Sequence, residues 1–202
     1  MSNHMSFVLV GVGGAGGRIV NEVANATDGR IPAIAIDTDF GAVSQLGSCQ
    51  QVRIAANQFN GAGSGGDYAS ARNAAETDLE SIRKALIDAS LAVVVAGLGG
   101  GTGSGITSVV LRIARELNIR TLVFTIMPFS FESDDRRAIA TRVHHTIENA
   151  ADVACLVAND TLCCDAAALP VEKAFSEATA FLADGILLLW RMKVGTSRFV
   201  LL

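Results

Sequence analysis

The stretch Leu91-Ala-Val-Val-Val-Ala-Gly-Leu-Gly-Gly-Gly-Thr-Gly-Ser-Gly105 joins a short apolar run to a segment with six glycines in nine residues. Residues 91–96 predict a buried β-strand, and the pattern after the glycines predicts a helix over residues 106–117. Glycine loses much conformational freedom on folding, and a simple turn does not need six. We therefore expect backbone amides here to bind an anion at the start of a helix, with Thr102 and Ser104 as added donors.

A second glycine-rich segment, Gly11-Val-Gly-Gly-Ala-Gly-Gly17, lies between an apolar run at residues 6–10 and a helical pattern at residues 15–26. By itself it suits two ligands equally. Its first, third and sixth residues, with Asp37 about 20 positions on, match the dinucleotide fingerprint of NAD(P)-dependent oxidoreductases. A nucleoside triphosphate suits it as well, and a tight turn without a ligand is a third interpretation. The glycines of residues 97–105 favour the triphosphate, since a dinucleotide site leaves them unexplained.

Neither glycine segment contains a lysine, so a Walker-type phosphate loop is excluded. The charge of bound phosphates would then be offset by amide dipoles and by Mg²⁺. We expect no direct side-chain metal ligands, with Mg²⁺ held through the phosphates near Asp37 and Asp39.

Short apolar runs alternate with helical patterns along the whole chain. Such alternation predicts an α/β fold with a doubly wound, mostly parallel, Rossmann-like sheet. The further predicted strands cover residues 33–36, 51–54, 121–127 and 153–157. The further predicted helices cover residues 67–89, with Asp67 as N-cap, 136–149 and 170–192.

The composition describes an ordinary globular chain of 202 residues, half of them apolar and 18% charged, with a net charge of −4. That charge, without a basic run, argues against nucleic-acid binding. No apolar stretch approaches the roughly 20 residues of a membrane span, so any membrane association is expected to be indirect. The four cysteines have no metal or redox spacing, which suits a cytoplasmic protein. We expect a tag-like or disordered start at residues 1–5, one domain at 6–192 and a short tail at 193–202.

Gly99-Gly-Gly-Thr-Gly-Ser-Gly105 resembles the signature of the tubulin/FtsZ family. Other segments resemble family motifs in the same order, namely Gly11–Gly17, Ala35-Ile-Asp-Thr-Asp39, Gly61-Ala-Gly-Ser64, Pro128-Phe-Ser-Phe-Glu132 with Arg136, and Asn159-Asp160. The resemblance runs from about Ser6 to Ile186. It implies the fold of that family's GTPase domain and GTP or GDP with Mg²⁺ as ligand.

The resemblance also implies roles for individual residues. Phosphates would lie on the two glycine segments, with the hydroxyl of Thr102 as a donor. Glu132 would bind the ribose, Arg136 would lie by ribose and phosphate, and Asn159 and Phe175 would face the nucleoside and base. The full expected site consists of Gly13, Gly14, Ala15, Gly16, Gly17, Arg18, Asp37, Asp39, Gly63, Gly101, Thr102, Gly103, Glu132, Arg136, Asn159, Phe175 and Thr179.

The chain departs from the family pattern at positions that matter for function. Arg18 and Thr179 replace residues that recognise guanine, and Asp37 replaces an asparagine, so base specificity is open. Residues 192–202 contain no carboxylate where the family has a catalytic aspartate loop, and the family's C-terminal domain does not follow. The resemblance thus implies weak or partner-dependent GTP hydrolysis.

We expect the protein to act by nucleotide-dependent self-association or partner binding, in cytoskeletal, cell-division or membrane-remodelling work. The partner, or a second copy, would cover an exposed apolar end of the last helix at residues 186–190. Two alternatives stay open at this point, a degenerate scaffold without nucleotide binding and an NAD(P)-dependent oxidoreductase domain.

Overall fold

A computed structural model describes residues 6–55, 58–163 and 169–196, and these form one parallel six-stranded sheet between two layers of helices. Residues 1–5 and 197–202 lie outside the described part. The strand order is β3-β2-β1-β4-β5-β6, so the chain winds outward in both directions from the centre. This confirms the doubly wound α/β fold, with its switch point between β1 and β4. The strands are β1 (Phe7–Val12), β2 (Ala33–Asp37), β3 (Gln50–Arg53), β4 (Leu91–Gly97), β5 (Arg120–Met127) and β6 (Val153–Ala158).

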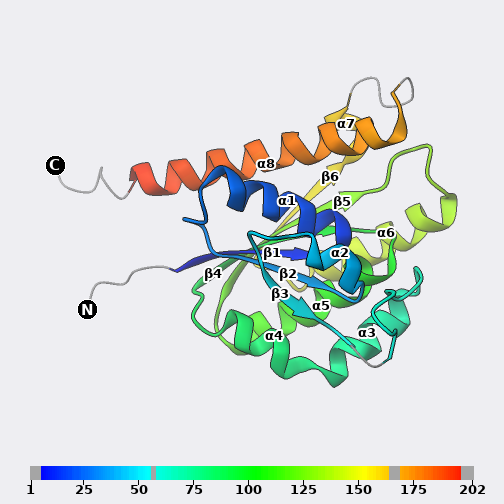
Figure 1. Cartoon of the computed structure of the whole chain (residues 1–202), viewed down its shortest axis with the longest axis horizontal. Helices are drawn as coiled ribbons and strands as arrows, with labels where there is room; N and C mark the ends of the chain where they lie inside the picture. Colours follow the sequence, from blue (N-terminus) through cyan, green and yellow to red (C-terminus); the bar gives the residue numbers. More distant parts are fainter. Residues whose placement is uncertain (1–5, 56–57, 164–168, 197–202) are drawn as a thin grey trace.

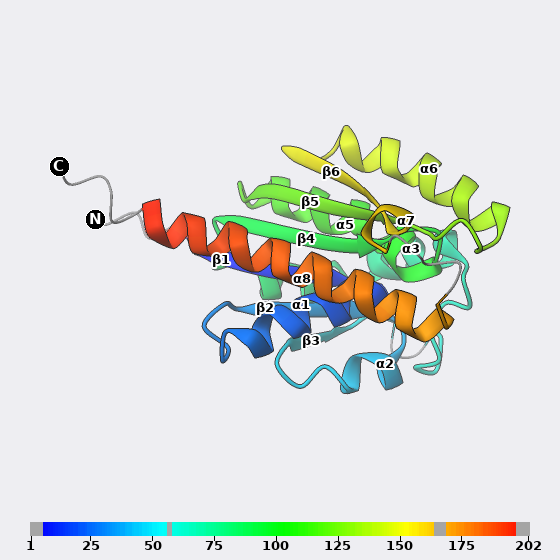
Figure 2. The same cartoon turned by 90° about the horizontal axis from the view of Figure 1, so that it is seen from above.

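The helices divide between the two faces of the sheet. Figure 1 shows α1 and α8 on one side and α3, α4 and α5 on the other, and Figure 2 shows α8 running across the sheet. The helices are α1 (Gly13–Ala26), α2 (Phe40–Ser44), α3 (Tyr68–Thr77), α4 (Leu79–Leu86), α5 (Gly101–Glu116), α6 (Asp134–Glu148), α7 (Asn159–Leu162) and α8 (Val171–Thr196). The short helices α2 and α7 were not expected from the sequence.

Strand β4 shows why the central strands are apolar along their whole length. Successive side chains of a strand point to opposite faces, and both faces of β4 are covered. Ala92, Val94 and Ala96 pack into the core beneath α3, α4 and α5. Val93 and Val95 pack into the second core, beneath α1 and α8. A continuous apolar run is therefore needed, as is typical of parallel sheets.

The helix predicted over residues 67–89 is two helices in the structure. Asp67 caps the first as expected, because its carboxylate accepts from the amides of Ala69 and Ser70 at 2.9 and 3.1 Å. The break lies at Asp78, whose backbone angles are not helical. The Thr77 hydroxyl donates to the Ala74 carbonyl and the Ser81 hydroxyl to the Asp78 carboxylate. Such local side-chain bonds compete with helix propagation.

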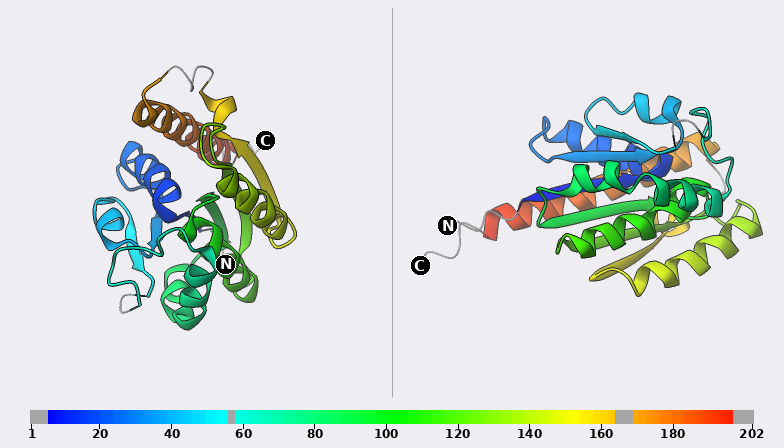
Figure 3. Two further views of the ribbon diagram at one scale, coloured as in Figure 1. Left: turned by 90° about the vertical axis from the view of Figure 1, so that its right-hand side faces the viewer. Right: turned by 90° about the horizontal axis from the view of Figure 1, so that it is seen from below.

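The prediction that residues 186–190 form an exposed apolar face is wrong in part. Ile186 and Leu187 are buried against the core shared with α1, whereas Leu188 and Leu189 are exposed. Helix α8 also continues to Thr196, so the expected tail at 193–202 begins as helix. Figure 3 shows the last turns of α8 projecting beyond the sheet.

Candidate nucleotide-binding site

A cavity of about 460 Å³ opens at the carboxyl ends of the central strands, where α1 and α5 begin. This is the place where ligands bind in doubly wound sheets. Fifteen of the seventeen expected residues line it, and Gly16 and Gly17 do not. Those that line it are Gly13, Gly14, Ala15, Arg18, Asp37, Asp39, Gly63, Gly101, Thr102, Gly103, Glu132, Arg136, Asn159, Phe175 and Thr179.

The glycines of the first segment serve different purposes. A Cβ on Gly16 would lie 2.1 Å from the Val95 carbonyl oxygen, and one on Gly17 would lie 2.7 Å from Leu46 Cδ1. These two glycines therefore let α1 pack against the sheet. Gly13 has a φ of +75°, which favours glycine for backbone reasons. At Gly14 a Cβ would meet nothing closer than the Arg18 guanidinium at 3.6 Å, so the fold does not require glycine there.

The second segment divides in the same way. Cβ atoms on Gly101, Gly103 and Gly105 would lie 2.0 to 2.3 Å from Ser64 Oγ, the Gly97 carbonyl oxygen and the Tyr68 carbonyl oxygen, respectively. Much of the glycine content thus has a packing reason, which corrects the inference that only an anion explains it. Gly100 is the exception, since it has a φ of −95° and open space around it. Gly14 and Gly100 both line the cavity and leave backbone exposed to it.

Asp37, at the end of β2, contacts Thr102 in the second glycine segment. Asp37 Oδ1 accepts from the amides of Thr38 and Asp39 at 2.7 and 3.1 Å and from the Thr102 hydroxyl at 3.0 Å. The single hydroxyl proton of Thr102 is therefore used within the protein, rather than free to donate to a phosphate as expected. Burial raises the pKa of Asp37 above its usual value, against the lowering effect of these hydrogen bonds.

Asp39 places a second carboxylate at the cavity edge. Its Oδ1 accepts from the Ala42 amide at 2.9 Å and so caps α2, while its backbone forms a bridge to Ala62. This bridge holds Gly63, with a φ of +79°, against the cavity. Within the described residues, the Oδ2 atoms of Asp37 and Asp39 receive no protein hydrogen bond. Two carboxylate oxygens at one edge fit the oxygen ligands that Mg²⁺ prefers.

The turn between β5 and α6 carries the two charged residues expected at the ribose. Glu132 Oε1 accepts from the Phe129 amide at 2.9 Å, and Arg136 Nη1 lies 2.6 Å from Glu132 Oε2. The two side chains thus form an ion pair at the cavity wall. Phe129 is fully buried and anchors the turn, with an edge-on contact of 5.1 Å between its ring centroid and that of Phe175.

The far end of the cavity lies between α1 and α8. Phe175 and Thr179 line it from α8, and Arg18 lines it from α1. The Thr179 hydroxyl donates to the Phe175 carbonyl at 2.8 Å. A neighbouring hollow of about 590 Å³ continues past the same three residues. The acids that line the cavity itself are Asp37, Asp39 and Glu132, whereas Glu22 and Glu172 line the neighbouring hollow.

Several lining residues were not expected from the sequence. Ala178 and Leu182 follow Phe175 by three and seven positions, so helical spacing could have found them. Ser64 ends the segment Gly61-Ala-Gly-Ser64 that resembles a family motif, and Gly65 and Gly66 follow it directly. Ala62, Gly97, Leu98, Gly100 and Pro128 lie in motifs singled out from the sequence but were not named individually, and Ile19, Ala42 and Ile126 were not expected.

The fold and the cavity define a doubly wound α/β domain with a cavity at the switch point of the sheet. The family model of the tubulin/FtsZ GTPase domain matches residues 6–166. The chain therefore belongs to the tubulin/FtsZ family. The oxidoreductase alternative has no such support.

Known relatives agree with this assignment. The cell division protein FtsZ of Buchnera aphidicola subsp. Schizaphis graminum is 33% identical over 162 residues, which are 80% of this chain and 42% of that protein. Among solved structures, a GTPγS-bound protofilament of CetZ2 from Haloferax volcanii has a TM-score of 0.82 and 30% identity over 92% of this chain and 58% of that one. An empty FtsZ dimer from M. jannaschii has a TM-score of 0.85 at 24% identity, over 93% of this chain and 55% of that one.

This chain spans less than half the length of that FtsZ relative and little more than half of the structural ones. In the part of the chain that the structure describes, no helix combines the length and apolar character needed to cross a membrane.

Proposed function

We propose that this chain binds GTP or GDP, with Mg²⁺, in the cavity between α1 and α5, and that nucleotide state controls its association with copies of itself or with a partner protein. Family membership supports a guanine nucleotide as ligand. A cytoplasmic location and work in cell division or a related cytoskeletal process are part of the same proposal.

The observation that carries this proposal is the pair Gly14 and Gly100. They line one cavity at the starts of α1 and α5, and neither is required to be glycine by packing or by backbone angle. The first amides of a helix have no partner within the helix and attract anions. A side chain at either position would separate a bound phosphate from those amides, which accounts for glycine at both.

Recognition of the base is proposed to be weaker than recognition of the phosphates. A guanine presents two donors, N1–H and the 2-amino group, on one edge, and a carboxylate can accept from both. The base end of the cavity offers the Arg18 guanidinium and the Thr179 hydroxyl instead. We therefore expect GTP to be preferred over ATP only modestly.

Hydrolysis is proposed to be slow in the isolated chain. A general base must reach the attacking water directly or through one further water. The three lining carboxylates have other places in this proposal, because the Oδ2 atoms of Asp37 and Asp39 lie at the proposed Mg²⁺ edge and Glu132 accepts from Phe129 and Arg136. A partner would then supply the group that activates water.

Self-association is proposed to use the outer face of α8. Phe181 and Leu188 are 61% and 59% exposed, and they lie seven residues apart on one face of the helix. Exposed large apolar side chains in a row mark association surfaces more often than single ones do.

The test is equilibrium binding of fluorescent GTP, GDP and ATP with Mg²⁺, with NADH as the control ligand. Saturable GTP binding that is displaced by ATP at a several-fold higher concentration than by unlabelled GTP is the expected result. Equal displacement by GTP and ATP would support the phosphate site but would show that the cavity does not select guanine. Absence of binding to any nucleotide would contradict the proposal and favour a scaffold without nucleotide binding.

A further inference from the structure

We propose that Asp160 is a positioning residue for the nucleoside end of the cavity. It attaches the turn that contains Glu132 to helix α7, which contains Asn159. This inference rests on the proposed nucleotide binding. Asp160 does not line the cavity itself, so any effect on a ligand must pass through its neighbours.

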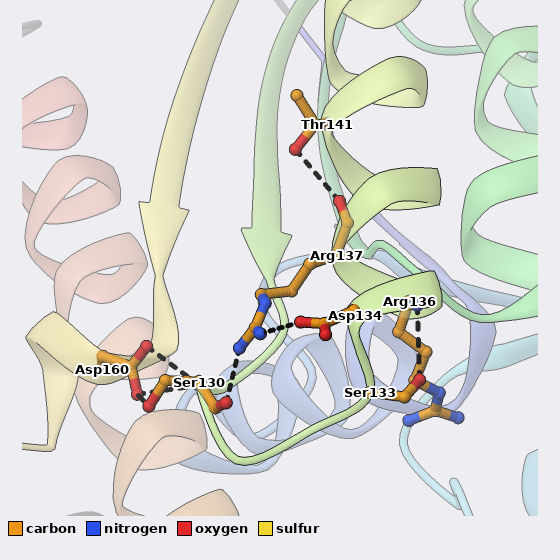
Figure 4. A network of polar contacts seen from close by, with 7 residues as sticks. All are labelled: Ser130, Ser133, Asp134, Arg136, Arg137, Thr141 and Asp160. Atoms are coloured by element: carbon orange, nitrogen blue, oxygen red, sulfur yellow. Dashed lines mark hydrogen bonds and ion pairs between the residues drawn. The ribbon is translucent and has the colours of Figure 1, made fainter.

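The contact between Asp160 and Ser130 has the geometry of a clamp. The Ser130 amide donates to both carboxylate oxygens of Asp160, at 3.1 and 3.0 Å, and the Ser130 hydroxyl donates to Oδ1 at 3.0 Å. Figure 4 shows the carboxylate of Asp160 facing Ser130 across the gap between the two segments. Hydrogen bonds to an ionised acceptor are stronger than those between neutral groups.

Ser130 is held from its other side as well. The Arg137 guanidinium donates to the Ser130 carbonyl and also pairs with Asp134 in the first turn of α6. The backbone amide, the hydroxyl and the carbonyl of Ser130 are thus all engaged, by groups from α7 on one side and α6 on the other.

The turn that contains Ser130 sets the position of Glu132. The Glu132 amide donates to the Phe129 carbonyl at 3.0 Å and closes a turn with Ser130 at its second position. The Glu132 carboxylate in turn accepts from the Phe129 amide. Because Phe129 is buried, one end of the turn is fixed by the core. Asp160 fixes Ser130, the residue that follows Phe129, so the backbone that positions Glu132 has little conformational freedom.

The clamp also joins two elements beyond the end of the sheet. Strands β5 and β6 pair up to Met127 and Ala158, and no strand pairing continues past these residues. Asn159, which is 6% exposed and lines the cavity, follows directly and precedes Asp160. Asp160 therefore sets the separation between Asn159 and Glu132, the two side chains proposed to contact the nucleoside.

The experiment compares the affinities of Asp160→Ala, Asp160→Asn and the wild type for GTP and for 2′,3′-dideoxy-GTP. The dideoxy nucleotide lacks the hydroxyls that Glu132 would bind. We expect Asp160→Ala to bind GTP roughly tenfold more weakly and the dideoxy nucleotide less than about twofold more weakly. Asp160→Asn keeps one acceptor oxygen and should fall between. Glu148→Ala is the matched control, since it removes an exposed carboxylate at the far end of α6, outside the contacts of Ser130, and it should leave both affinities unchanged.

A double-mutant cycle supplies the second readout. If Asp160 acts through Glu132, the loss in Glu132→Gln/Asp160→Ala will be smaller than the product of the two single losses. Equal losses for GTP and dideoxy-GTP, or no loss for either, would overturn the inference while the proposed function stands. A wild type that binds neither nucleotide would overturn both. Thermal midpoints within about 3 °C of the wild type would show that the variants are folded.

Discussion

The hydroxyl of Thr102 donates to Asp37 Oδ1 at 3.0 Å, and this hydrogen bond joins the end of β2 to the first turn of α5. The Thr38 hydroxyl lies 2.8 Å from the same Thr102 oxygen. The end of β2 and the second glycine segment are therefore tied together through side chains and not only through the sheet. The contact also places a buried carboxylate where the phosphates of a nucleotide would lie.

The first prediction concerns the pH dependence of stability. Burial raises the pKa of Asp37, so the folded state binds its proton more tightly than the unfolded state does. Stability contributed by the protonated form is present below the unfolded pKa and declines as pH rises through the raised folded value. We expect Asp37→Asn to be more stable than the wild type at pH 7, with a difference that shrinks toward pH 3. Urea unfolding at several pH values measures this, and a difference independent of pH would contradict it.

The second prediction concerns a glycine that close packing requires. Gly103→Ala should destabilise the fold by roughly 3 kcal/mol or more, because its Cβ would meet fixed backbone atoms of Gly97. Gly185→Ala is the control, since it lies in open space on α8 and should stabilise the helix by up to about 1 kcal/mol. Chemical denaturation measures both. Similar stabilities for the two variants would show that the close approach of α5 to β4 is not rigid.

The third prediction concerns base selectivity. Arg18→Asn combined with Thr179→Asp places an amide and a carboxylate at the base end of the cavity. The carboxylate can accept from both N1–H and the 2-amino group of guanine, whereas adenine has no 2-amino group and its N1 is an acceptor. The ratio of GTP to ATP affinity should rise by roughly tenfold. Ser176→Asp adds a carboxylate to the neighbouring hollow instead and should leave the ratio unchanged. Competition binding measures it, and an unchanged ratio in the double variant would place the base elsewhere.

The fourth prediction concerns association. Phe181→Ser with Leu188→Ser removes exposed apolar area from α8 and should weaken nucleotide-dependent self-association at least tenfold. Ile87→Ser is the control, because Ile87 is equally exposed but follows α4 on the opposite side of the sheet. Sedimentation of GTP-loaded protein measures the effect. Equal association in all three proteins would exclude this face of α8.

The strongly patterned parts of the molecule were predictable from the sequence. Residues 91–105 combine a buried strand, a glycine turn and a helix start, and the structure has these as β4 and α5. The order of the motifs places each of them at the carboxyl end of a strand, so most of the cavity lining follows from the topology. That Asp67 caps a helix follows from local chemistry alone.

Features that depend on contacts distant in the sequence were not predictable. Gly16 is required by the Val95 carbonyl, nearly 80 residues away, and nothing local distinguishes it from Gly14. The burial of Ile186 depends on the packing of α8 against the core beneath α1. The break at Asp78 has a local cause instead, since side-chain hydrogen bonds there interrupt a helical pattern that is continuous in the sequence.

The most direct test of the proposed function is an equilibrium titration of Mg·GTP into the wild type, Gly14→Ala, Gly100→Ala and the control Gly185→Ala. The wild type and the control should bind with the same micromolar affinity. Each cavity variant should be folded and yet bind at least tenfold more weakly, as expected if one phosphate hydrogen bond is lost. Undiminished binding in both cavity variants, or no binding by the wild type, would contradict the account.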